Sequence, residues 1–208
     1  MSVTIGRCYY FPIENLVDAV DAVREIARLD SDNMLPLTLP DGRVVEGPFW
    51  DEDFEQETKT WSRHPEKLRG PGDGASGETT IRAMIDGTIR EFFDADLGLR
   101  RTKDRHGNRF IYLPINVSLS LGVRFAEIMF ASECQEIGQM IALSESVHAV
   151  LDSVDSQADG VLVLEYGNGS LACEAPGGGI ISNNGNGEEM NPDEVVAFFS
   201  ERLNPNVT

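Results

Sequence analysis

The sequence predicts an α+β fold built on a mixed or antiparallel sheet, with its helices on one face of that sheet. Short runs of β-branched and aromatic residues indicate strands, and longer segments with apolar residues at helical spacing indicate amphipathic helices. The order strand–helix–strand–strand occurs twice, once near each end of the 208-residue chain. This recurrence suggests a weak internal duplication, although the same order also arises by coincidence.

The first β-α-β-β unit covers residues 1–47. Residues 3–11 predict a strand, and Pro12 ends it at a position suited to the first turn of a helix. The stripe of apolar residues over 13–29 predicts that helix. Two short apolar runs on either side of a Pro-Asp-Gly turn, over 35–46, predict a β-hairpin.

The second β-α-β-β unit lies within the range 79–208, after a predicted β-meander. Residues 123–131 predict its first strand, and the long apolar stripe over 133–154 predicts one helix. Two strands joined by a Gly-Asn-Gly turn are predicted over 161–174. A last helix near 192–203 begins at a proline.

Two segments between these units are harder to assign. Residues 48–78 contain both tryptophans, an acidic run and a Gly-Pro-rich cluster, and they predict an irregular loop or linker. Residues 79–93 fit a helix and an alternating strand almost equally well, and the helix is the favoured interpretation. The ranges 1–47, 48–78 and 79–208 are expected either as separate parts or as one domain.

The chain is strongly acidic, with 35 acidic and 17 basic residues and a formal net charge of −18. Residues 110–208 hold 14 acids and 2 bases, whereas residues 63–109 hold 10 bases and 8 acids. A field this negative disfavours nucleic acid and anionic membranes as partners and favours a basic protein. An acidic composition that serves solubility alone is the alternative interpretation.

The sequence contains no motif for catalysis, for a cofactor or for a metal. It has no Gly-Lys-Ser/Thr phosphate loop, no GxGxxG fingerprint and no GxSxG nucleophile motif. One stretch from Asp155 to Gly160 resembles the start of a calcium loop, but Tyr166 stands where the bidentate glutamate is needed. We therefore expect no metal and no cofactor, and an enzyme is less favoured than a binding protein.

The cysteines and the N-terminal residues suggest a cytoplasmic protein. Cys8, Cys134 and Cys173 are far apart in the sequence and indicate free thiols in a reducing compartment. No stretch is apolar enough to span a membrane, and the first residues lack a secretory signal pattern. We expect no membrane partner, and a homo-oligomer is compatible with the sequence.

Seven residues are candidates for contact with a partner. Trp50 and Trp61 could anchor a partner, or they could instead cover the core. Five bases crowd the stretch 100–109, where Arg101 and Arg105 would share one face of a strand and bind an anion or balance acids within the fold. Three acids off the apolar stripe of the predicted helix 133–154 would form a negative face: Glu133, Glu136 and Glu145.

The leading functional interpretation is a non-enzymatic acidic binding module that engages a basic protein partner, as inhibitor and immunity-like proteins do. The alternative is a small-molecule-binding domain with a pocket between the two halves of the chain. A ligand screen by thermal shift would separate the two interpretations.

Overall fold

The computed structural model describes residues 4–27, 34–55, 59–92, 99–167, 169–175, 179–183 and 190–203. Its strands are β1 (Ile5–Pro12), β2 (Leu35–Thr38), β3 (Val44–Gly47), β4 (Trp50–Glu55), β5 (Thr60–Lys67), β6 (Gly74–Met84), β7 (Arg101–Lys103), β8 (Arg109–Leu121), β9 (Phe125–Ser132), β10 (Leu162–Gly167), β11 (Ser170–Glu174) and β12 (Ile180–Ser182). Its helices are the 3₁₀ turn η1 (Ile13–Asn15), α1 (Leu16–Ala27), α2 (Gly87–Glu91), α3 (Gln135–Leu143), α4 (Glu145–Gln157) and α5 (Pro192–Leu203). The α+β class is therefore confirmed.

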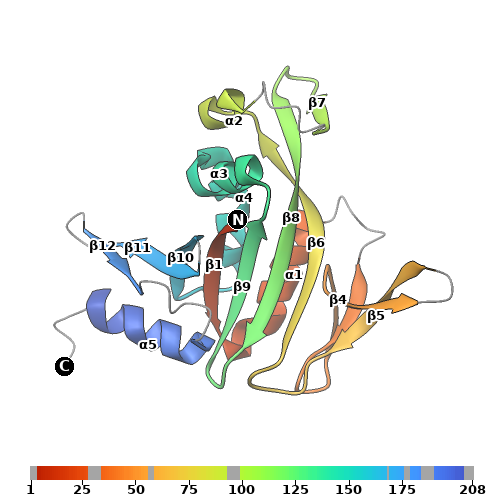
Figure 1. Cartoon of the computed structure of the whole chain (residues 1–208), viewed down its shortest axis with the longest axis vertical. Coiled ribbons are helices and arrows are strands. Elements are labelled where there is room, and N and C mark those ends of the chain that lie inside the picture. The colour runs from red at the N-terminus through yellow and green to blue at the C-terminus, as the bar shows by residue number, and fades with distance from the viewer. Residues whose placement is uncertain are drawn as a thin grey trace.

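All of these strands belong to one sheet, in the order β12-β11-β10-β1-β9-β8-β6-β4-β5-β2-β3, with β7 paired to β8 (Figure 1). Among the strands of the described residues, only the pair β2 and β5 is parallel. The N-terminal strand β1 lies between β9 and β10, so it separates the strands on either side of the second predicted helix. The two β-α-β-β segments thus exist as an order along the chain, but neither forms a sheet unit by itself.

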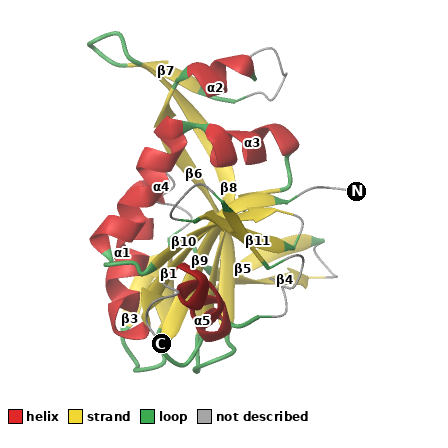
Figure 2. Ribbon diagram, turned by 90° about the vertical axis from the view of Figure 1, so that its left-hand side faces the viewer, coloured by secondary structure: helices red, strands yellow, loops and turns green. Residues whose placement is uncertain are grey.

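The helices cover both faces of the sheet, which corrects the prediction that they share one face. Because side chains alternate along a strand, neighbouring residues of β1 serve different cores. Tyr9 and Phe11 belong to the core beneath α1, α3 and α4. Cys8 and Tyr10 belong to a smaller core on the opposite face, which α5 covers. Figure 2 shows α1 and α4 along one side of the sheet and α5 apart from them.

The segment 48–78 is mostly strand, which corrects the predicted irregular loop. It contains β4 and β5, which form an antiparallel hairpin, and the beginning of β6. The favoured helix over 79–93 is also wrong, because β6 continues to Met84 and only the short α2 follows. Alternate residues in the second half of this strand, Thr79, Ile81 and Ala83, are buried, and β6 pairs with β8 along its whole length.

The single helix predicted over 133–154 is two helices with a break at Ser144. Ser144 has extended backbone angles, and its hydroxyl accepts a hydrogen bond from the N–H of Val147 and so caps α4. The same hydroxyl donates to Asp86, at 2.6 Å. Asp86 also accepts from the Ile89 N–H at 2.9 Å and thereby caps α2. One carboxylate thus holds the starts of two helices together.

Candidate functional site

The centre of the sheet face opposite α1 carries small side chains, and this face is turned toward the viewer in Figure 1. Small residues lie opposite one another in paired strands, so the side chains at the centre of this face are short. Gly74 of β6 lies opposite Ser120 of β8, and Ser76 lies opposite Ser118. Larger groups lie on both sides of this centre. On one side is Trp50 of β4, which pairs with Ser76, and on the other side α5 packs over β10 and β11. The result is a hollow across four strands.

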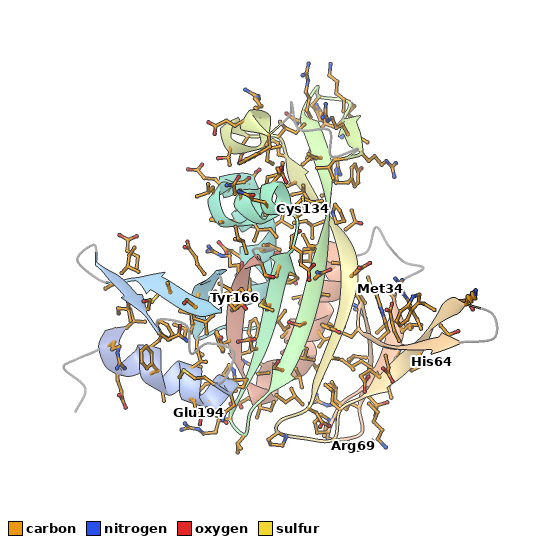
Figure 3. All side chains as sticks on the ribbon, viewed as in Figure 1. Met34, His64, Arg69, Cys134, Tyr166 and Glu194 are labelled. Atoms are coloured by element: carbon orange, nitrogen blue, oxygen red, sulfur yellow. The ribbon has the colours of Figure 1, made fainter. Side chains whose placement is uncertain are left out.

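Three adjoining cavities, of about 460, 360 and 280 Å³, occupy this hollow. The largest shares Gly74 and Ser120 with the smallest, and the smallest shares Trp50, Ser76 and Ser118 with the third. Together they form what we call the acidic groove. In Figure 3, Tyr166 lies on its β10 side and His64 lies on β5 at the opposite side.

The groove is lined by carboxylates from four strands and two loops. They are Glu52, Glu66, Asp73, Glu78, Glu127 and Glu133. Within the part of the chain that the structure describes, none of the lining residues is a lysine, an arginine or a histidine. Fixed negative charges that converge on a concave surface raise the local concentration of cations.

One arginine lies beside the groove at its β4 edge. Arg63 of β5 contacts Glu52 at 3.2 Å and Glu78 at 3.9 Å. Its guanidinium also stacks on the ring of Trp50, 4.1 Å from the ring centre, and the indole N–H donates to Glu52 at 2.9 Å. Ion pairs as exposed as these contribute little stability. Arg63 therefore orders this edge and offsets only part of its negative charge.

The most unusual group of the groove is Glu127 in the middle of β9. Its carboxylate is half-buried at the floor of the 460 Å³ cavity and accepts a hydrogen bond from the hydroxyl of the fully buried Tyr10. Burial raises the pKa of the Glu127 carboxyl above its ordinary value, and the hydrogen bond from Tyr10 opposes that rise. Burial likewise raises the pKa of the neighbouring Cys8 thiol, so this cysteine is not an activated nucleophile.

A second charged feature projects from the other end of β6 and β8 and is drawn at the top of Figure 1. We call it the basic tongue, residues 99–112. Lys103 and Arg109 are direct cross-strand neighbours, and with Arg101 they line a cavity of about 430 Å³. Among the described residues, no carboxylate forms an ion pair with Lys103 or Arg109. Like charges opposite each other in a sheet are unfavourable unless an anion lies between them.

The acidic residue of the tongue, Asp104, accepts hydrogen bonds within the turn of the tongue. Asp104 accepts hydrogen bonds from the backbone N–H groups of His106 and Asn108, at 2.8 and 2.9 Å, and from the Asn108 amide. Burial alone would raise the pKa of Asp104, but these hydrogen bonds outweigh it and lower the pKa below its ordinary value. The turn thus holds the cations in place without neutralising them.

The predicted partner-contact residues fall at several separate places. Trp50 is only 5% exposed and lines the groove, whereas Trp61, further along the same hairpin, is 65% exposed. Arg101 lies in the tongue cavity, and Arg105 lies in the adjacent turn, where its guanidinium donates to His106. The tryptophans and the arginines therefore belong to different surfaces.

The three glutamates do not share one helix face, because the predicted helix is broken. Glu133 precedes α3 and lines the 360 Å³ cavity of the groove. Glu136 is half-buried in α3 and accepts a hydrogen bond from the Cys134 thiol, at 3.3 Å. Glu145 is exposed in the first turn of α4. Of the three, only Glu133 joins the site.

Sequence reasoning missed Glu127, Tyr10 and the serine floor. One local signal existed for Glu127, because it interrupts the apolar strand Phe125–Ser132 with a charge. A charged residue inside a strand with apolar neighbours is rarely buried unless it has a partner or a function. The alternation of small polar and apolar residues up to Leu121 in β8 similarly indicated one face that is not packed.

The described residues contain no group of three or more histidine, cysteine, aspartate or glutamate side chains placed to hold a metal ion. None of the described helices is long and apolar enough to cross a membrane. Comparison with protein-family models, with curated proteins and with solved structures found no match to this chain.

Proposed function

We propose that this chain is a non-enzymatic acidic binding module that engages a basic protein partner, in the manner of inhibitor or immunity-like proteins, and that the acidic groove receives a lysine- and arginine-rich segment. One observation carries this proposal: three adjoining cavities share a lining with six carboxylates and, among the described residues, no basic side chain. The three free cysteines fit a cytoplasmic setting.

The shape of the groove suits an extended or irregular basic segment. Serines and glycine lower its floor, Trp50 and Met129 offer apolar contact, and the carboxylates of Glu78 and Glu133 stand along it. Lysine and arginine combine a long apolar stem with a charged end, so they can contact both kinds of surface. The net charge of −18 adds long-range steering and disfavours nucleic acid as a partner.

Fluorescence anisotropy with a labelled lysine-rich peptide tests this proposal. The double variant Glu78→Gln, Glu133→Gln removes two groove charges and should weaken binding by about tenfold, as two charge-assisted contacts of modest strength are lost. The matched control is Glu14→Gln, Asp18→Asn, which removes two exposed charges before and on α1, on the other face. Equal weakening by both pairs would show that net charge, and not the groove, binds the peptide.

A second candidate function is the binding of a small molecule in the 460 Å³ cavity. The favouring observation is that this cavity draws on both halves of the chain, with Cys8 and Gly72 on one side and Glu127 and Tyr166 on the other. Its volume is in the range of small-molecule sites. A thermal-shift screen separates the two candidates. A rise in Tm with a small molecule favours the second candidate, whereas a rise with the lysine-rich peptide alone favours the first.

A further inference from the structure

The cavity above Glu127 is built from directly paired strands. Glu127 lies opposite Tyr10 of β1 on one side and opposite Ser120 of β8 on the other. Ser120 in turn lies opposite Gly74. A large neighbour, Tyr10, thus holds the carboxylate by a hydrogen bond, while two small neighbours leave open space on the other side. The carboxylate therefore faces a cavity that remains open because Ser120 and Gly74 are small.

A half-buried carboxylate without a cation beside it is costly for the protein. Carboxylates that leave water are usually paired with a base or receive several hydrogen bonds. Here, among the described residues, the cavity lining holds no basic side chain, and the neighbour that donates to Glu127 is the neutral hydroxyl of Tyr10. The raised pKa of Glu127 agrees with this geometry, because burial raises it and the hydrogen bond from Tyr10 only partly opposes the rise.

The other side chains around the carboxylate are mostly apolar. The thioethers of Met129 and Met190 and the ring of Tyr166 line the same cavity. Thioethers and aromatic rings are flexible or flat surfaces that pack well against methylene groups, and aromatic rings also attract cations. The lining is therefore complementary to a short alkyl chain that carries a positive charge at its end.

We propose that the cavity above Glu127 is an ammonium-binding subsite, which takes one alkylammonium group with Glu127 as its counter-ion and the thioethers around its methylene stem. The proposal rests on the proposed function of the groove and makes it specific. The alkylammonium group comes either from a lysine side chain of the bound segment or from a free primary amine. The carboxylate must be ionised to bind it, so binding should become stronger as the pH rises through the raised pKa of Glu127.

Several other titratable groups face this cavity and must be separated from Glu127. Cys8 reaches it from β1, Asp73 from the loop before β6, and Tyr166 from β10. Tyr10 is fully buried behind the lining and contacts Glu127 through its hydroxyl. On α5, Asp193 follows the lining residue Pro192 and accepts hydrogen bonds from the N–H groups of residues 123–125. Burial raises the pKa values of Cys8 and Tyr10, so both stay neutral over the pH range of the experiment. Asp73→Asn is therefore the control variant.

Two ligand arms test the subsite. In the first, a lysine-rich peptide is compared with the same peptide in which norleucine replaces each lysine in turn. In the second, n-butylamine is added as a competitor of the unmodified peptide. We expect one lysine position to account for a loss of about 10 to 100-fold, the size of a charge-assisted hydrogen bond. Competition by n-butylamine at the wild-type groove would place a free amine in the same subsite.

Two variants at the subsite complete the test. In Glu127→Gln, replacing the sensitive lysine of the peptide by norleucine should no longer weaken binding, and affinity should no longer rise with pH. Asp73→Asn should keep the pH dependence. Ser120→Lys places an ammonium group directly across from Glu127 and should block both ligands. Glu127→Gln removes a half-buried charge that has no counter-ion, and Ser120→Lys supplies that counter-ion. Both should therefore raise the Tm of the free protein at neutral pH, which a merely structural role of Glu127 would not produce.

The outcomes distinguish this subsite from the proposed function. If the peptide binds wild-type protein and Glu127→Gln equally well at every pH, the ammonium subsite is wrong and the groove stands. If the peptide binds neither, both proposals fail. If Glu127→Gln and Ser120→Lys both lower Tm, Glu127 is a structural residue and the subsite is also wrong.

Discussion

The acidic groove and the basic tongue are built on the same two strands, β6 and β8, and they differ in what surrounds their charges. At the groove end these strands present glycine and serine, and carboxylates gather over them. At the tongue end Arg82 stacks on Phe110 at 3.7 Å, and Arg100 stacks on Tyr112 at 4.9 Å. The cavities of the groove partly shield its charge from water. The tongue projects beyond the rest of the sheet (Figure 1), and Arg101, Lys103 and Arg109 are exposed there.

This difference predicts two kinds of binding. A half-buried charge interacts strongly with an oppositely charged group that displaces the water around it, but that group must fit the shape of the groove. An exposed charge interacts weakly and is screened by salt. The groove should therefore dominate the affinity for a basic partner, and the tongue should add a weaker contact with anions.

The largest effect should come from reversing charge within the groove. Glu78→Lys with Glu133→Lys adds two positive charges where cations are expected to bind. This double variant should weaken the binding of a lysine-rich peptide by about 100-fold or more at low salt. The same reversal at Glu14 and Asp18 is the control and should cost less than about tenfold. Fluorescence anisotropy measures both, and equal losses would remove the distinction between the groove and the rest of the surface.

The next effect concerns Asp86, which holds the starts of α2 and α4 together. Asp86→Ala removes the hydrogen bonds to Ile89, Ser144 and Ser146 at the point where β6 leaves the sheet. Loss of a cap and of two further contacts should lower the free energy of unfolding by about 2 kcal/mol. Chemical denaturation measures this value, and the reversal of groove charge should leave it almost unchanged.

The contribution of Asp86 should also depend on pH in a defined direction. Burial raises its pKa, but hydrogen bonds from Ile89, Ser144 and Ser146 outweigh burial, and the pKa in the folded protein is below the ordinary value. Stability that comes from a lowered pKa is fully present above the unfolded pKa of about 4 and is lost as the pH falls through the folded pKa. The difference between wild type and Asp86→Ala should therefore shrink below about pH 4.

A smaller effect is expected at the tongue. Arg101→Glu with Arg105→Glu should weaken the binding of inorganic pyrophosphate several-fold at low salt, because exposed charges each contribute less than about 1 kcal/mol. The same variant should bind the lysine-rich peptide as wild type does. Calorimetry with pyrophosphate measures the first quantity, and unchanged heats in the variant would mean that the cations serve only the internal charge balance.

The smallest effect is expected from calcium. Asp155 and Gln157 lie inside α4, so the two first oxygen ligands of the calcium-like stretch are on a helix and not in a loop. The twelfth-position glutamate is also absent from the sequence. We expect no binding at about 10 µM or tighter, and a calorimetric titration with a higher affinity would contradict this.

Local patterns were sufficient for those elements whose own residues decide their structure. The helix near 13–29 is present as η1 and α1, and the hairpin near 35–46 as β2 and β3. The ambiguous segment 79–93 needed information from far away, because pairing with β8 decides that it is a strand. The break at Ser144 depends on Asp86, which is 58 residues distant. Serine is a common N-cap, but it lies here within a continuous apolar stripe, so this local signal was not sufficient to predict the break.

The polar strands β4 and β5 were missed for a different reason. Residues of β5 are mostly exposed on both faces, so the alternation of apolar and polar residues that indicates a strand is missing. The site itself depends on cross-strand neighbours from β1, β6, β8 and β9, which are far apart along the chain. Composition could therefore point to Trp50 and Glu133, but the position of Glu127 beside Tyr10 required the sheet register.

The central claim is that the groove, and not the net charge of the molecule, recognises a basic partner. Stopped-flow kinetics with a lysine-rich peptide test it most directly, with rate constants measured over a range of salt concentrations. We predict an association rate that is raised about 10 to 1000-fold at low salt and falls steeply as salt rises. We also predict a dissociation rate that barely changes with salt but rises in Glu78→Gln, Glu133→Gln and not in Glu14→Gln, Asp18→Asn. Dissociation rates that are equal in the two variants, or association that is indifferent to salt, would contradict the account.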